Sequence, residues 1–149
     1  MTKLLLGLLF SLFVTGKSTI SEKTIKHEHV IFKLNIKNKI KRLISVAIVM
    51  MPYNRATDVE EDWQTKAWYN LSPGETLSLE TWNRIFYYYA ESKPDFFGAK
   101  LYWKGSKYRT IDGEECGFKE IKINSDFRST LEYDSESDCY IYNLNLVKY

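Results

Sequence analysis

The sequence lacks the short patterns that identify an enzyme. It has no Gly-rich phosphate loop, no Gly-x-Ser-x-Gly elbow and no paired carboxylates in a recognisable catalytic arrangement. Only 2 His and 2 Cys are present. A catalytic Cys needs a base such as His, and His27 and His29 lie far from Cys116 and Cys139 in the chain. We therefore predict a protein that is not an enzyme, with no catalytic residues and no cofactor.

A concentration of charge of one sign is also missing. The chain holds 21 Lys plus Arg and 19 Asp plus Glu, so its formal net charge is +2 at pH 7. The charges are interspersed, and no basic block exists of the kind that follows a phosphate backbone. We predict no nucleic-acid partner.

Only one long apolar run is present, at residues 4–14. Lys3 precedes it, and residues 14–16 are small residues at the positions that a signal peptidase reads. The run is shorter than the about 20 residues that a transmembrane helix needs. Residues 1–16 are therefore predicted to be a signal peptide helix, removed on export to the periplasm or the extracellular space. A retained anchor and a buried N-terminal helix are the open alternatives. No later run is long enough for stable membrane insertion.

The rest of the chain has the composition of one folded domain. Apolar residues make up 44% of the sequence and aromatic residues 15%, which is enough to build a core. Residues 17–28 are polar and are predicted to form a flexible start of the mature chain. Residues 29–149 have the size of a single domain.

Short β-strands are predicted throughout that domain. Residues 32–37 alternate between apolar and polar side chains, as a strand with one covered face does. Residues 43–51 form a continuous apolar run, typical of a strand covered on both faces. Turns rich in Gly, Pro, Asn and Asp separate the other predicted strands, at residues 64–70, 76–82, 84–91, 99–104, 107–111, 118–124, 130–133 and 139–147. We predict an all-β fold, a single compact β-sandwich or barrel-like domain of about 8–10 short, mainly antiparallel strands.

Four consecutive aromatic residues, Phe86 to Tyr89, raise the main question about a binding surface. In a strand, Phe86 and Tyr88 point to one face of the sheet, and Tyr87 and Tyr89 to the other. Either both faces are covered, or one face is an exposed strip that binds a ligand. We favour the covered strand, because four tryptophans lie on or beside neighbouring strands and can pack on these rings. In the alternative, the candidate ligand-binding residues are Trp68, Tyr69, Trp82, Tyr87, Tyr89 and Trp103.

The two cysteines are predicted to form a disulfide. An exported chain enters an oxidising space, where an even number of cysteines suggests a bridge between Cys116 and Cys139. Two buried free thiols and a catalytic thiol are the alternatives.

Possible metal ligands are interpreted as solvated side chains. His27 and His29 are too few for a closed site. The acidic loops at residues 58–62 and 134–138 lack the spaced ligands and the fixed Gly of an EF-hand loop. No metal site is predicted.

Three segments together resemble the bacterial DUF1036 family: AWYNLSPGE at residues 67–75, YYYAE at 87–91 and CGFKEI at 116–121. The upstream strand and Trp63 also fit the family pattern, so the resemblance spans about residues 43–124. Tyr69 stands where Trp is common in the family. The family is, by its name, of unknown function, and the resemblance implies export and a compact β-rich domain.

Two functional hypotheses remain. The first is an exported non-enzymatic domain that binds a protein or cell-envelope partner. The second is a β-sandwich that binds a carbohydrate or another small ligand through exposed Trp and Tyr rings. An enzyme built on scattered carboxylates such as Glu75, Glu80 and Glu91 would need a deep pocket. Whether the Trp and Tyr rings face solvent distinguishes the first of these hypotheses from the second.

Overall fold

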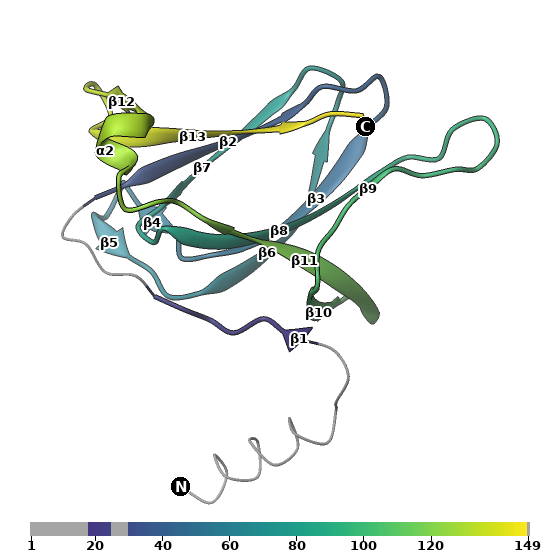
Figure 1. Cartoon of the computed structure of the whole chain (residues 1–149), viewed down its shortest axis with the longest axis horizontal. Coiled ribbons are helices and arrows are strands. Elements are labelled where there is room, and N and C mark those ends of the chain that lie inside the picture. Colours follow the sequence, from purple (N-terminus) through teal and green to yellow (C-terminus); the bar gives the residue numbers. More distant parts are fainter. Residues whose placement is uncertain (1–17, 25–29, 149) are drawn as a thin grey trace, which may run out of the picture.

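The structure, a computed structural model, describes residues 18–24 and 30–148, and these form an all-β domain (Figure 1). The predicted fold class is therefore confirmed. The predicted signal peptide at residues 1–16 lies outside the described residues, as do His27 and His29. Two β-sheets face each other, and one further hairpin and one short helix lie at their edge.

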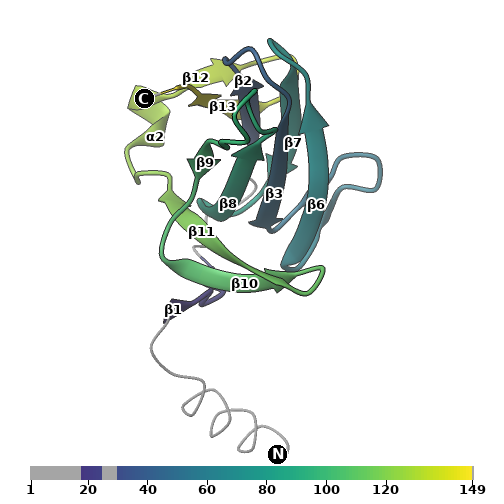
Figure 2. The same ribbon diagram turned by 90° about the vertical axis from the view of Figure 1, so that its right-hand side faces the viewer.

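The larger sheet has seven strands. Six of them follow the order β1-β10-β11-β8-β3-β6, and the seventh, β9, pairs with the later residues of β8, after the part that pairs with β11. Figure 2 shows β8, β3 and β6 side by side. All neighbours are antiparallel except β1 and β10. The strands are β1 (Ser18–Thr19), β3 (Ile44–Met50), β6 (Gln64–Leu71), β8 (Ile85–Ser92), β9 (Tyr102–Trp103), β10 (Lys107–Ile111) and β11 (Glu114–Lys122).

The smaller sheet has four strands in the order β12-β13-β2-β7, and β13 runs parallel to β2. Its strands are β2 (Phe32–Asn38), β7 (Thr76–Thr81), β12 (Glu132–Asp134) and β13 (Cys139–Leu146). The hairpin of β4 (Tyr53–Asn54) and β5 (Val59–Glu60) and the helix α2 (Phe127–Thr130) complete the fold. Each of the two sheets contains one parallel pair, and all their other strand pairs are antiparallel, so the prediction of mainly antiparallel strands is confirmed.

The inner core lies between the two sheets. Phe32, Leu34 and Ile36 alternate along β2 and point into it, as the sequence pattern predicted. From the larger sheet, Phe86 and Tyr88 of β8 pack into the same core. The alternation of β2 therefore fixes which of its faces is buried, because a slip of one residue would expose all three side chains.

An outer core covers the opposite face of the larger sheet. Tyr87 and Tyr89 of β8 pack there, with the ring centroids of Trp63 and Trp68 each 5.9 Å from one of these tyrosines. The larger sheet is curled, so that β6 and β10, far apart in strand order, meet through side chains. Arg109 donates a hydrogen bond to Thr65 (2.7 Å) and the Trp68 indole donates one to Asp112 (3.2 Å). This curl encloses the outer core, and β8 is covered on both faces, as predicted.

Residues 18–24 are part of the folded domain. β1 pairs with β10, and Ile20 packs on the outer core. The Tyr87 hydroxyl donates a hydrogen bond to the Ser21 carbonyl (2.6 Å), and the Asn83 amide donates one to the Lys23 carbonyl (2.8 Å). Residues 18–24, which lie within the segment predicted to be a flexible start of the mature chain, are thus joined to the domain by hydrogen bonds.

The predicted disulfide is wrong. Cys116 lies in the outer core on β11, and Cys139 begins β13 in the other sheet, so the two thiols are not close. Both are free and buried, and burial raises the pKa of each thiol. The alternative of two buried free thiols is the one observed. An even cysteine count could not reveal that the two residues fall on different sheets.

Candidate functional site

Three of the six aromatic residues predicted as ligand-binding are buried. Tyr87, Tyr89 and Trp103 are 0%, 8% and 3% exposed. Their rings fill the two cores, and the Trp103 indole donates a hydrogen bond to the Val147 carbonyl (3.1 Å). The prediction that these three rings face a ligand is corrected, because neighbouring strands cover the surfaces that a sugar would stack on.

The other three candidates are half-buried and do not form a common surface. Trp68 and Tyr69 are consecutive in β6, so Trp68 faces the outer core while Tyr69 packs on the inner core. The Trp82 indole N–H faces the backbone of Glu61 and donates a hydrogen bond to its carbonyl (2.7 Å). No planar row of solvent-facing rings exists among the six residues, so the carbohydrate hypothesis lacks the surface it needs.

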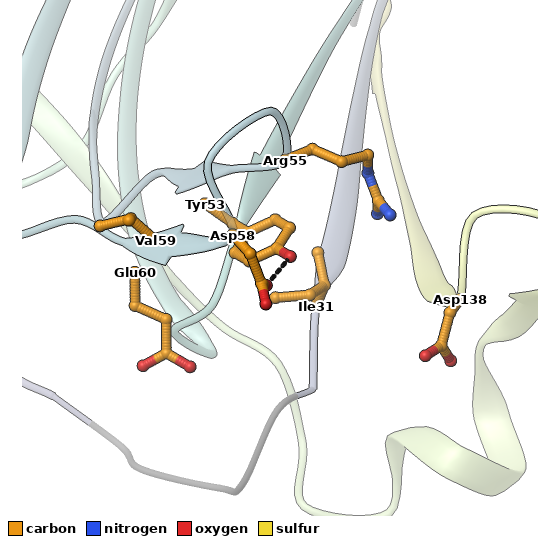
Figure 3. Close-up of a pocket in the computed structure, with 7 residues that line it drawn as sticks. All are labelled: Ile31, Tyr53, Arg55, Asp58, Val59, Glu60 and Asp138. Carbon is orange, nitrogen blue, oxygen red and sulfur yellow. Dashed lines mark hydrogen bonds between the residues drawn. The ribbon is translucent and has the colours of Figure 1, made fainter.

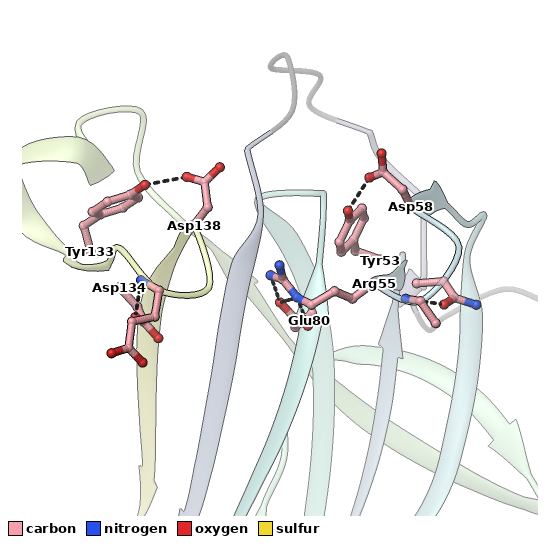
Figure 4. A network of polar contacts seen from close by, with 10 residues as sticks. Tyr53, Arg55, Asp58, Glu80, Tyr133, Asp134 and Asp138 are labelled. Carbon is pink, nitrogen blue, oxygen red and sulfur yellow. Dashed lines mark hydrogen bonds and ion pairs between the residues drawn. The ribbon is translucent and has the colours of Figure 1, made fainter.

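A hollow of about 650 Å³ lies at one end of the smaller sheet (Figure 3). The lining residues are Ile31, Tyr53, Arg55, Asp58, Val59, Glu60 and Asp138. Two hairpins of the same design border it, β4–β5 and β12–β13 (Figure 4). Each hairpin encloses four loop residues, of which the last is an Asp with positive φ, 53° for Asp58 and 49° for Asp138.

A tyrosine closes each of the two hairpins. The Tyr53 hydroxyl donates a hydrogen bond to Asp58, and the Tyr133 hydroxyl donates one to Asp138. These bonds to carboxylates raise the pKa of both tyrosines. The charged Asp side chains are thus used to hold the turns, which is a structural role.

Arg55, in the loop of the β4–β5 hairpin, also has a partner within the domain. Its guanidinium forms a bidentate ion pair with Glu80 of β7, with Nε 2.9 Å from Oε1, and this pair raises the pKa of Arg55. The other two carboxylates proposed for an enzyme lie elsewhere and have partners. Glu75 accepts a hydrogen bond from the Ser72 amide (2.9 Å), and Glu91 pairs with Lys100 (3.2 Å). The three acids do not converge.

The hollow offers no metal centre among residues 18–24 and 30–148, where no group of three or more His, Cys, Asp or Glu side chains is placed to hold an ion. Three of the four charged side chains at its wall, those of Arg55, Asp58 and Asp138 but not Glu60, are held by these bonds within the domain. We therefore assign the hollow to the architecture of the two hairpins.

The connection between β8 and β9, residues 93–101, is the most unusual surface of the domain, and we name it the aromatic loop. It projects from the body of the domain in Figure 1. Phe96 and Phe97 at its tip are 96% and 90% exposed, and their rings meet edge to face with centroids 5.5 Å apart. Large apolar side chains this exposed are a mark of a binding surface when they lie together.

Hydrogen bonds brace the aromatic loop from inside. The Asp95 carboxylate accepts bonds from the Phe97 amide (2.8 Å) and the Ala99 amide (2.9 Å), and these bonds lower the pKa of Asp95. Its own amide donates to the Ala99 carbonyl (2.8 Å). Gly98 follows the two phenylalanines and has φ +85°, a backbone conformation that residues with a side chain rarely adopt. The tip is therefore a turn of defined conformation, held by hydrogen bonds.

Arg42 braces the aromatic loop from outside. Its guanidinium donates to the carbonyls of Lys93 (3.1 Å) and Ala99 (3.0 Å), at the two sides of the loop. Beside this contact is a hollow of about 330 Å³, lined by Lys39, Ile40, Lys41, Arg42, Leu101 and Lys148. The base of the aromatic loop is thus rich in cations.

Phe96 and Phe97 are not among the binding residues predicted from the sequence, although the sequence carries a signal for them. Two adjacent phenylalanines lie between Pro94-Asp95 and Gly98. Turn residues on both sides predict a loop tip, where neither ring can be covered by the neighbouring strands.

No protein-family model matches this chain, and no curated protein sequence matches it either. The resemblance to DUF1036 therefore stays a prediction. Within residues 18–24 and 30–148, no helix has the length and apolar character needed to span a membrane.

Proposed function

We propose that this chain is an exported, non-enzymatic binding domain that attaches to a cell-envelope partner through the aromatic loop. The observation that carries the proposal is the nearly complete exposure of Phe96 and Phe97 side by side on a braced turn. In the same domain, the rings of β8 are buried. The fold thus buries the aromatic side chains of β8 but leaves the two at the tip in solvent, where a partner can contact them.

Bracing supports a binding role because it lowers the cost of association. A flexible loop loses conformational entropy when a partner fixes it, whereas a preorganised loop has less to lose. The bonds from Asp95 and Arg42 hold the aromatic loop in one shape before any partner arrives. Export rests on the N-terminal sequence and on the proposed DUF1036 relationship, which adds no activity.

The proposal is tested by sedimentation with the envelope fraction of the cells that make the protein. Three proteins with the same N-terminus are compared: the wild type, Phe96→Ser/Phe97→Ser, and Val59→Ser. Val59 is an exposed apolar residue on β5, away from the loop in Figure 1, so Val59→Ser is the matched control. We expect the wild type and the control to sediment with the envelope and the loop variant to stay in solution. Equal sedimentation of all three would contradict the proposal.

A further inference from the structure

We infer that the partner of the aromatic loop is an anionic lipid bilayer, into whose surface Phe96 and Phe97 insert while nearby cations contact the headgroups. This inference rests on the proposed function and names the chemistry of its partner. Three features support it: the apolar tip, the cations at the base and the shape of the loop.

The tip of the aromatic loop has the chemistry of a membrane wedge. Phe96 and Phe97 are 96% and 90% exposed, and Gly98 and Ala99 beside them carry no charge. The one acidic side chain of the loop, Asp95, is turned back onto the amides of Phe97 and Ala99. Both bonds end on Oδ1, so they satisfy one of the two carboxylate oxygens and reduce only part of the cost of bringing Asp95 close to the acyl chains.

Several cations lie at the base of the aromatic loop, where the proposal places the lipid headgroups. Lys93 and Lys100 stand on its two sides, and Lys39, Lys41 and Lys148 line the hollow beside Arg42. The field of Arg42 and Lys148 reaches Asp95 and contributes to lowering its pKa. The nearby acid Glu91 is paired with Lys100. The surplus is positive, which complements an anionic membrane surface.

Tyr102 adds a third exposed ring between the tip and the body of the domain. It is an exposed residue of β9, and the Lys104 ammonium lies 5.2 Å from the centroid of its ring. An amphipathic ring beside a long cationic side chain suits the boundary between acyl chains and headgroups.

The shape of the loop favours a bilayer over a second copy of the chain or another protein. A stable protein interface buries about 800 Å² on each partner. A narrow projection carrying two phenyl rings presents much less than this to a flat protein surface. A bilayer needs no matching pocket, since it closes around any inserted side chain.

Vesicle binding tests the inference directly. The full chain, recovered with the same N-terminus in every variant, is sedimented with vesicles of phosphatidylcholine or of an equimolar mixture with anionic phosphatidylglycerol. We expect the wild type to bind the mixed vesicles more tightly, and to lose this preference at high salt. Phe96→Ser/Phe97→Ser should weaken binding at least about tenfold, whereas Val59→Ser should not.

Charge is tested with a second matched pair. Lys41→Gln/Lys93→Gln removes two cations near the loop and leaves Arg42 in place, because Arg42 braces the loop. We expect binding to mixed vesicles to fall about fivefold for each cation. Lys119→Gln/Lys122→Gln removes two cations from β11 and should have little effect. An equal loss in both variants would overturn the role of the loop cations.

Insertion has its own readout. Phe97→Trp places a reporter at the tip, and the change in fluorescence is read against the wild type with its 4 Trp. Lipids brominated on the acyl chains should quench the added signal. Absence of quenching while the protein is bound would overturn insertion.

The two proposals fail in different ways. In one outcome, neither the wild type nor any variant binds vesicles, but the envelope fraction still binds the wild type and not Phe96→Ser/Phe97→Ser. The bilayer is then the wrong partner, while the proposal that the aromatic loop binds the envelope is supported. If binding to the envelope is also independent of Phe96 and Phe97, both proposals fall.

Discussion

β8 and the aromatic loop follow each other in the chain, yet they place aromatic rings in opposite environments. Phe86 to Tyr89 in β8 are at most 8% exposed, whereas Phe96 and Phe97 are at least 90% exposed. β8 is paired with β3 on one side and with β11 and β9 on the other, and both of its faces are covered. The loop has left the sheet, and hydrogen bonds from its own turn and from Arg42 define its shape.

A high density of aromatic residues therefore does not locate a binding surface in this domain. The tyrosine-rich strand attracts attention in the sequence, but its rings hold the two cores together. The pair of phenylalanines is less conspicuous, and neither ring has a structural task among the described residues beyond the contact with the other. Substitutions in the two regions should therefore differ widely in their effects on stability.

Removing one ring from each face of β8 should destabilise the domain most. Tyr87→Ala opens a cavity in the outer core and Tyr88→Ala opens one in the inner core, and each should lower the free energy of unfolding by about 3–5 kcal/mol. Denaturant unfolding measures both. If either variant lost less than about 0.5 kcal/mol, as a surface substitution does, the corresponding face would not be packed.

The turn at the tip of the loop should show a smaller effect. Gly98 has φ +85°, and no atom lies within 4 Å of the place that a Cβ would take, so Gly98→Ala adds backbone strain without a clash. We expect a loss of about 1–2 kcal/mol in the free energy of unfolding, measured in denaturant. Gly98→Asn is the control, since Asn tolerates this conformation better. An equal loss in both variants would show that the left-handed backbone is not the cause.

The Tyr87 hydroxyl should contribute less still. Tyr87→Phe keeps the ring and removes the hydrogen bond to the Ser21 carbonyl, which should cost about 0.5–1.5 kcal/mol in the free energy of unfolding. The effect should lie at the low end, because water can reach the exposed Ser21.

The same hydroxyl gives a pH dependence. Burial raises the pKa of Tyr87 from 10.0 to about 12. The folded state therefore holds this proton more tightly, so its contribution is fully present below pH 10 and is lost as pH rises through 12. Alkaline unfolding of the wild type and of Tyr87→Phe measures the difference, and the variant should depend less on pH in this window. Equal dependence would exclude Tyr87 as its source.

The all-β fold could be predicted because strand signals are local. The alternation of β2 and the continuous apolar run of β3 are visible in the sequence, and both strands are buried as their patterns indicate. The parallel pairing of β13 with β2 could not be predicted, since it joins segments from opposite ends of the chain. The same limit applies to Cys116 and Cys139, whose separation depends on which sheet each strand joins.

Much less of the candidate site could be predicted. Whether Tyr87 is covered depends on Trp63 and Ile20, and the partner of its hydroxyl is Ser21, and all three come from other segments of the chain. The strand pattern alone left both possibilities open. The tip of the aromatic loop was more accessible to sequence reasoning, because Pro94, Asp95 and Gly98 define a turn locally.

The variant expected to lose the least stability is the one that separates the two regions most sharply. Phe96→Ser/Phe97→Ser removes two rings that contact each other and are almost fully in water. Neither substitution removes a backbone hydrogen bond of the turn, and no cavity can form at an exposed site. We expect the free energy of unfolding to change by no more than about 0.5 kcal/mol, while binding to mixed vesicles is lost. A loss of stability comparable to that of Tyr87→Ala would mean that the two rings pack on the domain, and the aromatic loop would then be a structural element like β8.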